Sequence, residues 1–175
     1  MAVSDFSVPA SAILERFKAN GVTHATTVPD LVQLSLHAEL AEDDDVQLIE
    51  CAAENQALTT AFGLHVGGKT PVVVMQNQGL MNCLNTLRSV GISAQTPMVI
   101  SVGQFGREFA NLGEDTASSG RVVVNTIEPV LEAMGIPFER LETAEDLDRV
   151  DACFAKAREA QCPVVLLVGH YTAWA

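Results

Sequence analysis

The feature that most constrains the fold is a regular alternation between short apolar segments and longer amphipathic segments along the whole chain. Six apolar runs are rich in β-branched residues and have the length of buried strands. This alternation predicts a three-layer α/β fold, in which helices cover both faces of a mostly parallel six-stranded sheet. The predicted strands cover residues 23–28, 46–50, 70–75, 98–102, 138–141 and 163–168.

Between these runs, apolar residues recur at helical spacing, and glycines or polar turns separate the segments. The first predicted helix has Ser7 as its cap and Pro9 in its first turn, and it stops at Gly21. Residues 103–120 are rich in glycine, serine and charge, which is typical of a mobile loop. The remaining predicted helices cover residues 31–40, 53–66, 80–90, 127–134 and 144–160, with polar turns at 43–45 and 76–79.

The length and the net charge limit the classes of protein to which this chain can belong. The 175 residues fit one domain, which we place at residues 1–175. A formal net charge of −12 argues against nucleic acid and anionic membranes as partners, because both select basic surfaces. No apolar run approaches the roughly 20 residues of a membrane span, and the N-terminus does not resemble a signal peptide. We therefore expect a cytoplasmic protein.

The cysteines and histidines do not show the spacing of metal ligands. The four cysteines form no C-x-x-C pair and sit in apolar segments, and the four histidines are scattered. Reduced, buried thiols and no metal site on this chain are the expectation.

Polar residues follow several predicted strands, and ligands of parallel sheets bind just beyond the carboxyl ends of strands. The glycine-rich cradles of dinucleotides and nucleoside triphosphates are missing, as is the nucleophile elbow of the hydrolases. Two strand ends carry the remaining chemistry, one around Glu54 and one at residues 76–82. Taken alone, Glu54 also suits the first turn of any helix, and Asn77-Gln78-Gly79 also suits an ordinary turn.

Together these segments resemble the pyrimidine-binding domain of thiamine-diphosphate enzymes, and in particular the alpha chain of sulfopyruvate decarboxylase and the matching half of phosphonopyruvate decarboxylase. The resemblance runs from the first predicted helix to the last strand. Glu54 falls at the nearly invariant glutamate of this family. The other matching positions are Val28-Pro29-Asp30, Ala57, Gly63, Gln76-Asn77-Gln78-Gly79-Leu80, Asn82 and Asn85.

This resemblance implies a role for each matching residue. Glu54 would be catalytic, hydrogen-bonding the aminopyrimidine ring nitrogen and thereby promoting loss of the thiazolium proton. The implied cofactor contacts are Glu54, Asn77, Gln78, Gly79 and Asn82, and the implied substrate contacts are Pro29, Asp30 and Gln104.

Two departures from the family pattern are informative. The G-D-G and Asn-Asn motif that holds Mg²⁺ and the diphosphate is absent, and it belongs to a second domain. We therefore expect a beta subunit to supply it, in an α2β2 or larger assembly. Relatives with sulfonate or phosphonate substrates also carry a basic, His-containing segment after the fourth strand. Here residues 103–120 contain one arginine, Arg107, and no histidine. Uncharged or singly charged 2-oxo acids or 2-hydroxy ketones are the expected substrates.

The preferred function is non-oxidative decarboxylation of a 2-oxo acid. An acyloin- or benzoin-type lyase or carboligase with the same cofactor is the close alternative. A flavodoxin-like binding or regulatory module, in which Glu54 has no chemical role, is the alternative from another class.

Overall fold

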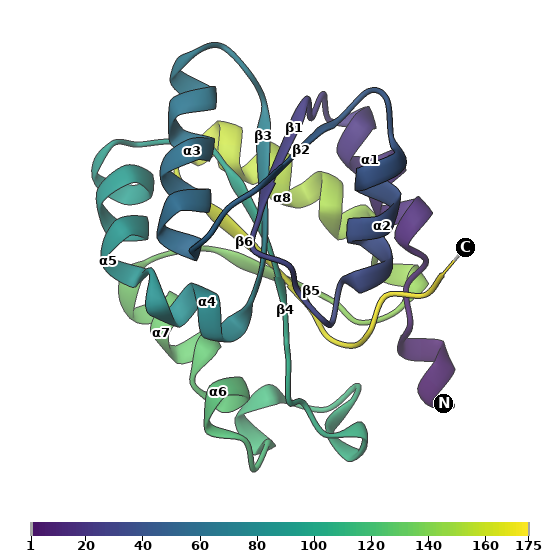
Figure 1. Ribbon diagram of the computed structural model, residues 1–175. Coiled ribbons are helices and arrows are strands. Elements are labelled where there is room, and N and C mark those ends of the chain that lie inside the picture. The colour runs from purple at the N-terminus through teal and green to yellow at the C-terminus, as the bar shows by residue number, and fades with distance from the viewer. Residues whose placement is uncertain (1, 175) are drawn as a thin grey trace.

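The computed structural model describes residues 2–174 and contains a six-stranded sheet between two layers of helices (Figure 1). The strand order is β2-β1-β3-β4-β6-β5, and every neighbouring pair is parallel. The predicted three-layer α/β fold is therefore confirmed, with a sheet that is parallel throughout. The strands are β1 (His24–Thr27), β2 (Gln47–Glu50), β3 (Pro71–Gln76), β4 (Val99–Gly103), β5 (Phe138–Leu141) and β6 (Val164–Val168).

Alternating side chains of each strand supply the two halves of the core. Val72 and Val74 of β3 face the layer that contains α1, α2 and α8, whereas Val73 and Met75 face the layer of α3, α4 and α7. The helices are α1 (Ala10–Ala19), α2 (Leu34–Glu42), α3 (Glu54–Val66), α4 (Asn77–Asn82), α5 (Leu84–Thr86), α6 (Val122–Asn125), α7 (Ile127–Met134) and α8 (Asp148–Ala160). Within residues 2–174, none of them combines the length and apolar character that crossing a bilayer requires.

The helix predicted over residues 80–90 is wrong in its outline. Strand β3 continues through Gln76, which pairs with Gly103, and α4 begins directly at Asn77. The helix is then interrupted at Cys83, whose ψ of 18° departs from helical geometry, before α5 and a π-helix at Leu87–Ser93. The polar turn predicted at 76–79 is thus the last residue of a strand and the first turn of a helix.

Other boundaries also differ from the predictions. Helix α1 begins at Ala10, and Ser7 does not cap it, because its hydroxyl donates a hydrogen bond of 2.9 Å to the Tyr171 carbonyl. Residues 103–120 form the predicted loop, in which short 3₁₀ turns lie at Phe109–Asn111 and Thr116–Ser118, and the unpredicted helix α6 follows them. Further 3₁₀ turns lie at Val3–Phe6 and at Ala144–Asp146, just before α8.

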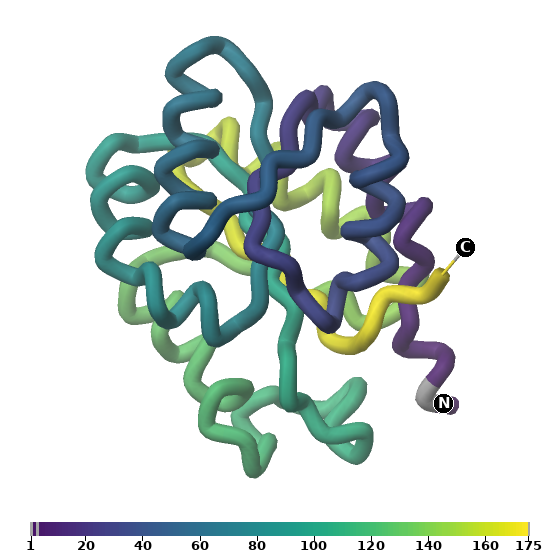
Figure 2. The backbone as a smooth tube through the Cα atoms, viewed as in Figure 1, coloured from purple at the N-terminus to yellow at the C-terminus, as the bar shows by residue number. Residues whose placement is uncertain are grey.

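The parallel sheet gives the molecule two different edges. Segments after the strands gather at the carboxyl edge, where the chain after β4 projects away from the sheet (Figure 2). Segments before the strands gather at the opposite, amino edge. The two ends of the chain run side by side, since Pro9 forms a bridge with Ala173.

Candidate functional site

The structure brings Glu54 into contact with Gly79 at the carboxyl edge. Glu54 is the first residue of α3, and Gly79 lies in the first turn of α4. A Cβ atom built on Gly79 would lie 2.4 Å from Glu54 Cγ and 2.6 Å from Glu54 Oε1. Because real carbon atoms do not approach so closely, the Glu54 side chain occupies space that only a glycine leaves open. Two residues that the sequence singled out separately thus form one unit.

The carboxylate of Glu54 is available to a ligand. Its side chain is half-buried, and no side chain or backbone group within residues 2–174 hydrogen-bonds to it. Cys83, one turn beyond Gly79, lies near enough to feel its charge: burial first, and then the negative charge of Glu54, raises the pKa of the Cys83 thiol to about 12. Cys83 is therefore a neutral, apolar neighbour of the carboxylate at physiological pH.

Asn77 joins the segment after β3 to the segment after β4. Its side chain is fully buried, and Nδ2 donates a 3.0 Å hydrogen bond to the Phe105 carbonyl. Its Oδ1 accepts a 3.0 Å hydrogen bond from the Gln78 backbone N–H. Both polar atoms of the Asn77 amide are therefore engaged in hydrogen bonds within the protein.

Asp30 is buried beneath the carboxyl edge rather than displayed on it. Its carboxylate accepts hydrogen bonds from the Val32 backbone N–H at 2.8 Å and from Gln33 Nε2 at 2.7 Å. It also lies against Gly103, where an added Cβ would meet Asp30 Oδ2 at 2.1 Å. Glycine at 103 is therefore needed for the close approach of this carboxylate to β4.

A polar network extends from Asp30 into the core. The amide of Gln33 also accepts a 2.5 Å hydrogen bond from the Ser101 hydroxyl, and His37 Nε2 accepts one of 2.9 Å from the Asp30 backbone N–H. Burial raises the pKa of Asp30, although the hydrogen bonds from Gln33 and Val32 offset part of that effect. Burial also lowers the pKa of His37 to about 4, so this imidazole is neutral near pH 7.

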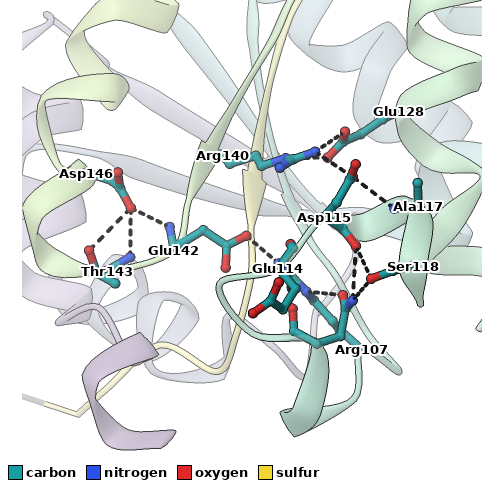
Figure 3. Close-up of polar contacts among 11 residues, drawn as sticks. Arg107, Glu114, Asp115, Ala117, Ser118, Glu128, Arg140, Glu142, Thr143 and Asp146 are labelled. Carbon is teal, nitrogen blue, oxygen red and sulfur yellow. Dashed lines mark hydrogen bonds and ion pairs between the residues drawn. The ribbon is translucent and has the colours of Figure 1, made fainter. Parts of the chain in front are cut away.

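Arg107, the one arginine of the loop after β4, is an internal residue. Its side chain is 1% exposed and forms an ion pair with Glu142 at the end of β5 (Figure 3). The guanidinium also donates to Asn111 Oδ1, to the Asn111 carbonyl and to the Glu114 carbonyl, at 2.9–3.0 Å. Arg107 therefore organises the loop, and its positive charge is already neutralised.

The remaining predicted residues lie in different environments along the same edge. Gln78, Asn82 and Pro29 are exposed, so their side chains are open to a ligand or a partner. Gln104 is only 2% exposed, and both polar atoms of its amide lack a hydrogen-bond partner within residues 2–174. A buried, unpaired amide is costly and marks a place where a ligand, a water molecule or a loop movement completes the structure.

The sequence and fold were then compared with known proteins. A family model described as "Thiamine pyrophosphate enzyme, N-terminal TPP binding domain" matches residues 9–134, which is more than half of the chain. The chain belongs to this thiamine pyrophosphate enzyme family. The matched segment contains the Glu54–Gly79 contact, the Asp30 network and the Arg107 loop.

Curated proteins similar to this chain include alpha subunits of sulfopyruvate decarboxylase. The chain is 28% identical to sulfopyruvate decarboxylase subunit alpha of Methanothermobacter thermautotrophicus over 130 residues, which cover 74% of this chain and 75% of the relative. It is 25% identical to the subunit of the same name from Methanocaldococcus jannaschii over 138 residues, 77% of each chain. These values support the resemblance inferred from the motifs.

Solved structures of thiamine pyrophosphate enzymes share the fold. Benzoylformate decarboxylase from Polynucleobacter necessarius superposes with a TM-score of 0.73 at 17% identity, over 92% of this chain and 29% of that one. A thiamine diphosphate-dependent 4-hydroxybenzoylformate decarboxylase of Rhodococcus jostii gives 0.71 at 18% identity, over 97% and 32%. The chain thus spans about a third of each of these longer proteins.

The residues at the Glu54 site fit the pyrimidine end of thiamine pyrophosphate. A hydrogen-bonding ring needs a carboxylate with free lone pairs, and Glu54 provides one, while Gly79 makes room for the Glu54 side chain. Within residues 2–174, no group of three or more His, Cys, Asp or Glu side chains lies close enough together to hold a metal ion.

Sequence reasoning missed the residues that support the site from within. Gln33 and Ser101 hold Asp30, and Glu142 neutralises Arg107. One signal was present, because Ser101 interrupts an otherwise apolar strand. Gln33 and Glu142 look like ordinary polar residues near an element boundary, so no local pattern distinguishes them.

Proposed function

We propose that this chain is the pyrimidine-binding subunit of a split thiamine-diphosphate enzyme that decarboxylates a 2-oxo acid without oxidation. Residues 1–175 would form a single pyrimidine-binding domain. The contact between Glu54 and Gly79 carries the proposal, because it holds an unpaired carboxylate at the carboxyl edge of a fold shared with this family. The family match favours this enzyme over a non-catalytic flavodoxin-like module.

Glu54 has the central role in this proposal. Its carboxylate would share a proton with the ring nitrogen of the cofactor's aminopyrimidine, while Gly79 leaves room for the side chain and Cys83 keeps one side of the carboxylate apolar. When bound, thiamine diphosphate supplies an electron sink for cleavage of the bond next to a carbonyl group. Gln78 and Asn82 would complete the cofactor contacts from α4, and the buried Asn77 would hold this segment in place through its hydrogen bonds to Phe105 and Gln78.

The loop after β4 and the turn after β1 would shape the substrate side. Asp30 and Gln104 are buried residues of these two segments, and Pro29 is exposed on the turn itself. The loop's one arginine, Arg107, is already paired with Glu142, so its charge is not available to a sulfonate or phosphonate. We therefore infer that uncharged or singly charged 2-oxo acids or 2-hydroxy ketones are preferred over sulfopyruvate.

A second subunit would complete the enzyme. The curated relatives are themselves named as alpha subunits, and the chain lacks the G-D-G motif expected for Mg²⁺ and the diphosphate. We propose that a beta subunit carries these groups in an α2β2 or larger assembly. Large apolar side chains that the fold leaves exposed are available to such a partner: Leu31, Leu34, Phe109, Tyr171 and Trp174.

The test combines cofactor titration with assembly. The chain is purified alone and together with a candidate partner whose sequence carries G-D-G and a downstream Asn-Asn pair. We expect calorimetry to show weak thiamine diphosphate binding by the isolated chain and tight, Mg²⁺-dependent binding by the complex. Trp174, the only tryptophan and 65% exposed, should report assembly through a blue shift of its fluorescence.

The two parts of the proposal fail separately. Tight cofactor binding by the isolated chain would contradict the split site. A complex that binds the cofactor tightly but releases no CO₂ from a panel of 2-oxo acids would contradict decarboxylation and favour the carboligase alternative. Faster turnover of sulfopyruvate than of singly charged 2-oxo acids would contradict the inference from Arg107.

A further inference from the structure

A cavity of about 400 Å³ lies at the amino edge of the sheet, at the end opposite to Glu54. It opens where β3 and β4 begin, between the last turns of α3 and α8. Pro71, Pro97, Met98 and Phe154 give it an apolar side. Its volume lies within the range of small-molecule sites, roughly 300–1,000 Å³.

The other side of the cavity is basic, although the protein is strongly acidic. Lys69 and Arg158 line it, and the chain has only ten lysines and arginines in total. Six of the ten form ion pairs, and within residues 2–174 four do not: Lys69, Arg88, Arg121 and Arg158. Half of the cations without a carboxylate partner therefore meet at one cavity.

Neighbouring groups leave these two charges free. Asn20 lines the cavity and donates a hydrogen bond of 2.6 Å to Asp151, whose carboxylate also pairs with Arg16 at 2.7 Å. Arg158 itself only touches the Asn20 amide oxygen, at 3.5 Å. Within residues 2–174, neither Lys69 nor Arg158 therefore forms an ion pair with a carboxylate.

We propose that this cavity binds a small organic carboxylate with an apolar body. The carboxylate would lie between Lys69 and Arg158, and the apolar part would lie against Met98 and Phe154. The site is separate from the proposed function, because it lies at the other edge of the sheet from the Glu54 carboxylate.

The helices around the cavity oppose the binding of an anion. Helices α1, α3 and α8 all end beside it, and the carbonyl ends of helices carry partial negative charge that disfavours an anion. Binding therefore depends on the two side-chain charges. If both are removed, the remaining electrostatic field should repel a carboxylate.

The experiment titrates the full chain with cyclohexanecarboxylate while backbone amides are followed by NMR. We expect saturable shifts at Gly68, Thr70 and Met98, and binding about tenfold weaker for the neutral cyclohexanecarboxamide. Lys69→Gln and Arg158→Gln should each weaken binding about two- to fivefold, and the double variant should abolish it. Acetate, which has the charge without the apolar body, should bind more weakly than cyclohexanecarboxylate.

Arg88→Gln is the matched control, because Arg88 also lacks an ion pair within residues 2–174 but does not line the cavity. It should bind cyclohexanecarboxylate as the parent does. Equal binding of the carboxylate and the carboxamide would overturn the proposal, as would equal losses in the control and the cavity variants. Shifts confined to the Glu54 edge, or no saturable shift up to about 10 mM ligand, would overturn it as well.

Discussion

Single residues show which parts of the candidate site can be predicted from the sequence and which cannot. Glu54 and Gly79 could be selected from their places after two strands, because carboxyl ends of parallel strands share one edge. The contact between these two residues could not be predicted, because it depends on how α3 and α4 pack together. Asp30 was selected for the same reason as Glu54, but its burial depends on Gln33 and Ser101, which are distant partners without a local signature.

The Glu54–Gly79 contact predicts an unusual response to alanine. Gly63→Ala, in the exposed part of α3 with nothing within 4 Å of the new methyl group, should stabilise the protein by about 0.5–1 kcal/mol. Gly79→Ala is also a change within a helix, yet it should destabilise by about 1–3 kcal/mol and displace Glu54. Chemical unfolding of both variants measures this, and equal effects would show that Glu54 moves aside without cost.

His37 predicts how stability depends on pH. Its pKa falls from 6.5 to about 4 on folding, so the unfolded chain binds a proton that the folded chain rejects between these values. This contribution is fully present above pH 6.5, and up to roughly 3 kcal/mol is lost as pH falls to 4. The raised pKa of Asp30 acts in the opposite direction, since its contribution is lost as pH rises through the folded value.

Urea unfolding across this pH range tests the role of His37. His37→Gln should flatten the slope of unfolding free energy against pH between 4 and 6.5. The control His24→Gln changes a half-buried histidine at the start of β1 and should leave the slope of the parent unchanged. A parent slope that survives in His37→Gln would assign the effect to another group.

At the scale of elements, the apolar strands and long helices were predictable, whereas the segments around the site were not. The strands and long helices have a clear periodicity of two or 3.6 residues, so their existence follows from the sequence. The turns after Gly103 depend on tertiary contacts of Arg107 and Asn77, and no local pattern marks the break of the helix at Cys83. Such contacts override local propensity, which is why these boundaries were wrong.

Arg107 therefore predicts a large effect from one loop residue. Arg107→Gln leaves the Glu142 carboxylate poorly paired and removes three hydrogen bonds to the loop, so it should cost about 3 kcal/mol of stability or more. The matched control Arg16→Gln breaks the exposed pair with Asp151, whose side chains are 45% and 38% exposed, and should cost about 1 kcal/mol or less. Adding Glu142→Gln to the first variant should recover part of the loss, and a loss below that of the control would refute the structural role.

At the scale of the whole molecule, a parallel α/β fold followed from the alternation of segments, but the strand order did not. Sequence-adjacent strands β4 and β5 are separated by β6 in the sheet, and this order depends on packing across the molecule. The proposal of a partner subunit also rests on features of the whole molecule. Within residues 2–174, the Glu54 carboxylate has no hydrogen-bond partner and several apolar side chains are exposed, and the chain spans only about a third of the two solved decarboxylases described above.

The central claim is that Glu54 activates the cofactor, and hydrogen–deuterium exchange at the thiazolium carbon tests it without requiring the right substrate. The measurement compares the complex of this chain and its partner with the same complex carrying Glu54→Gln, which keeps the size and hydrogen-bonding capacity of the side chain. We predict that both complexes bind thiamine diphosphate and that exchange slows by about 10²–10⁴-fold in the variant. Exchange as fast in Glu54→Gln as in the parent would contradict the account.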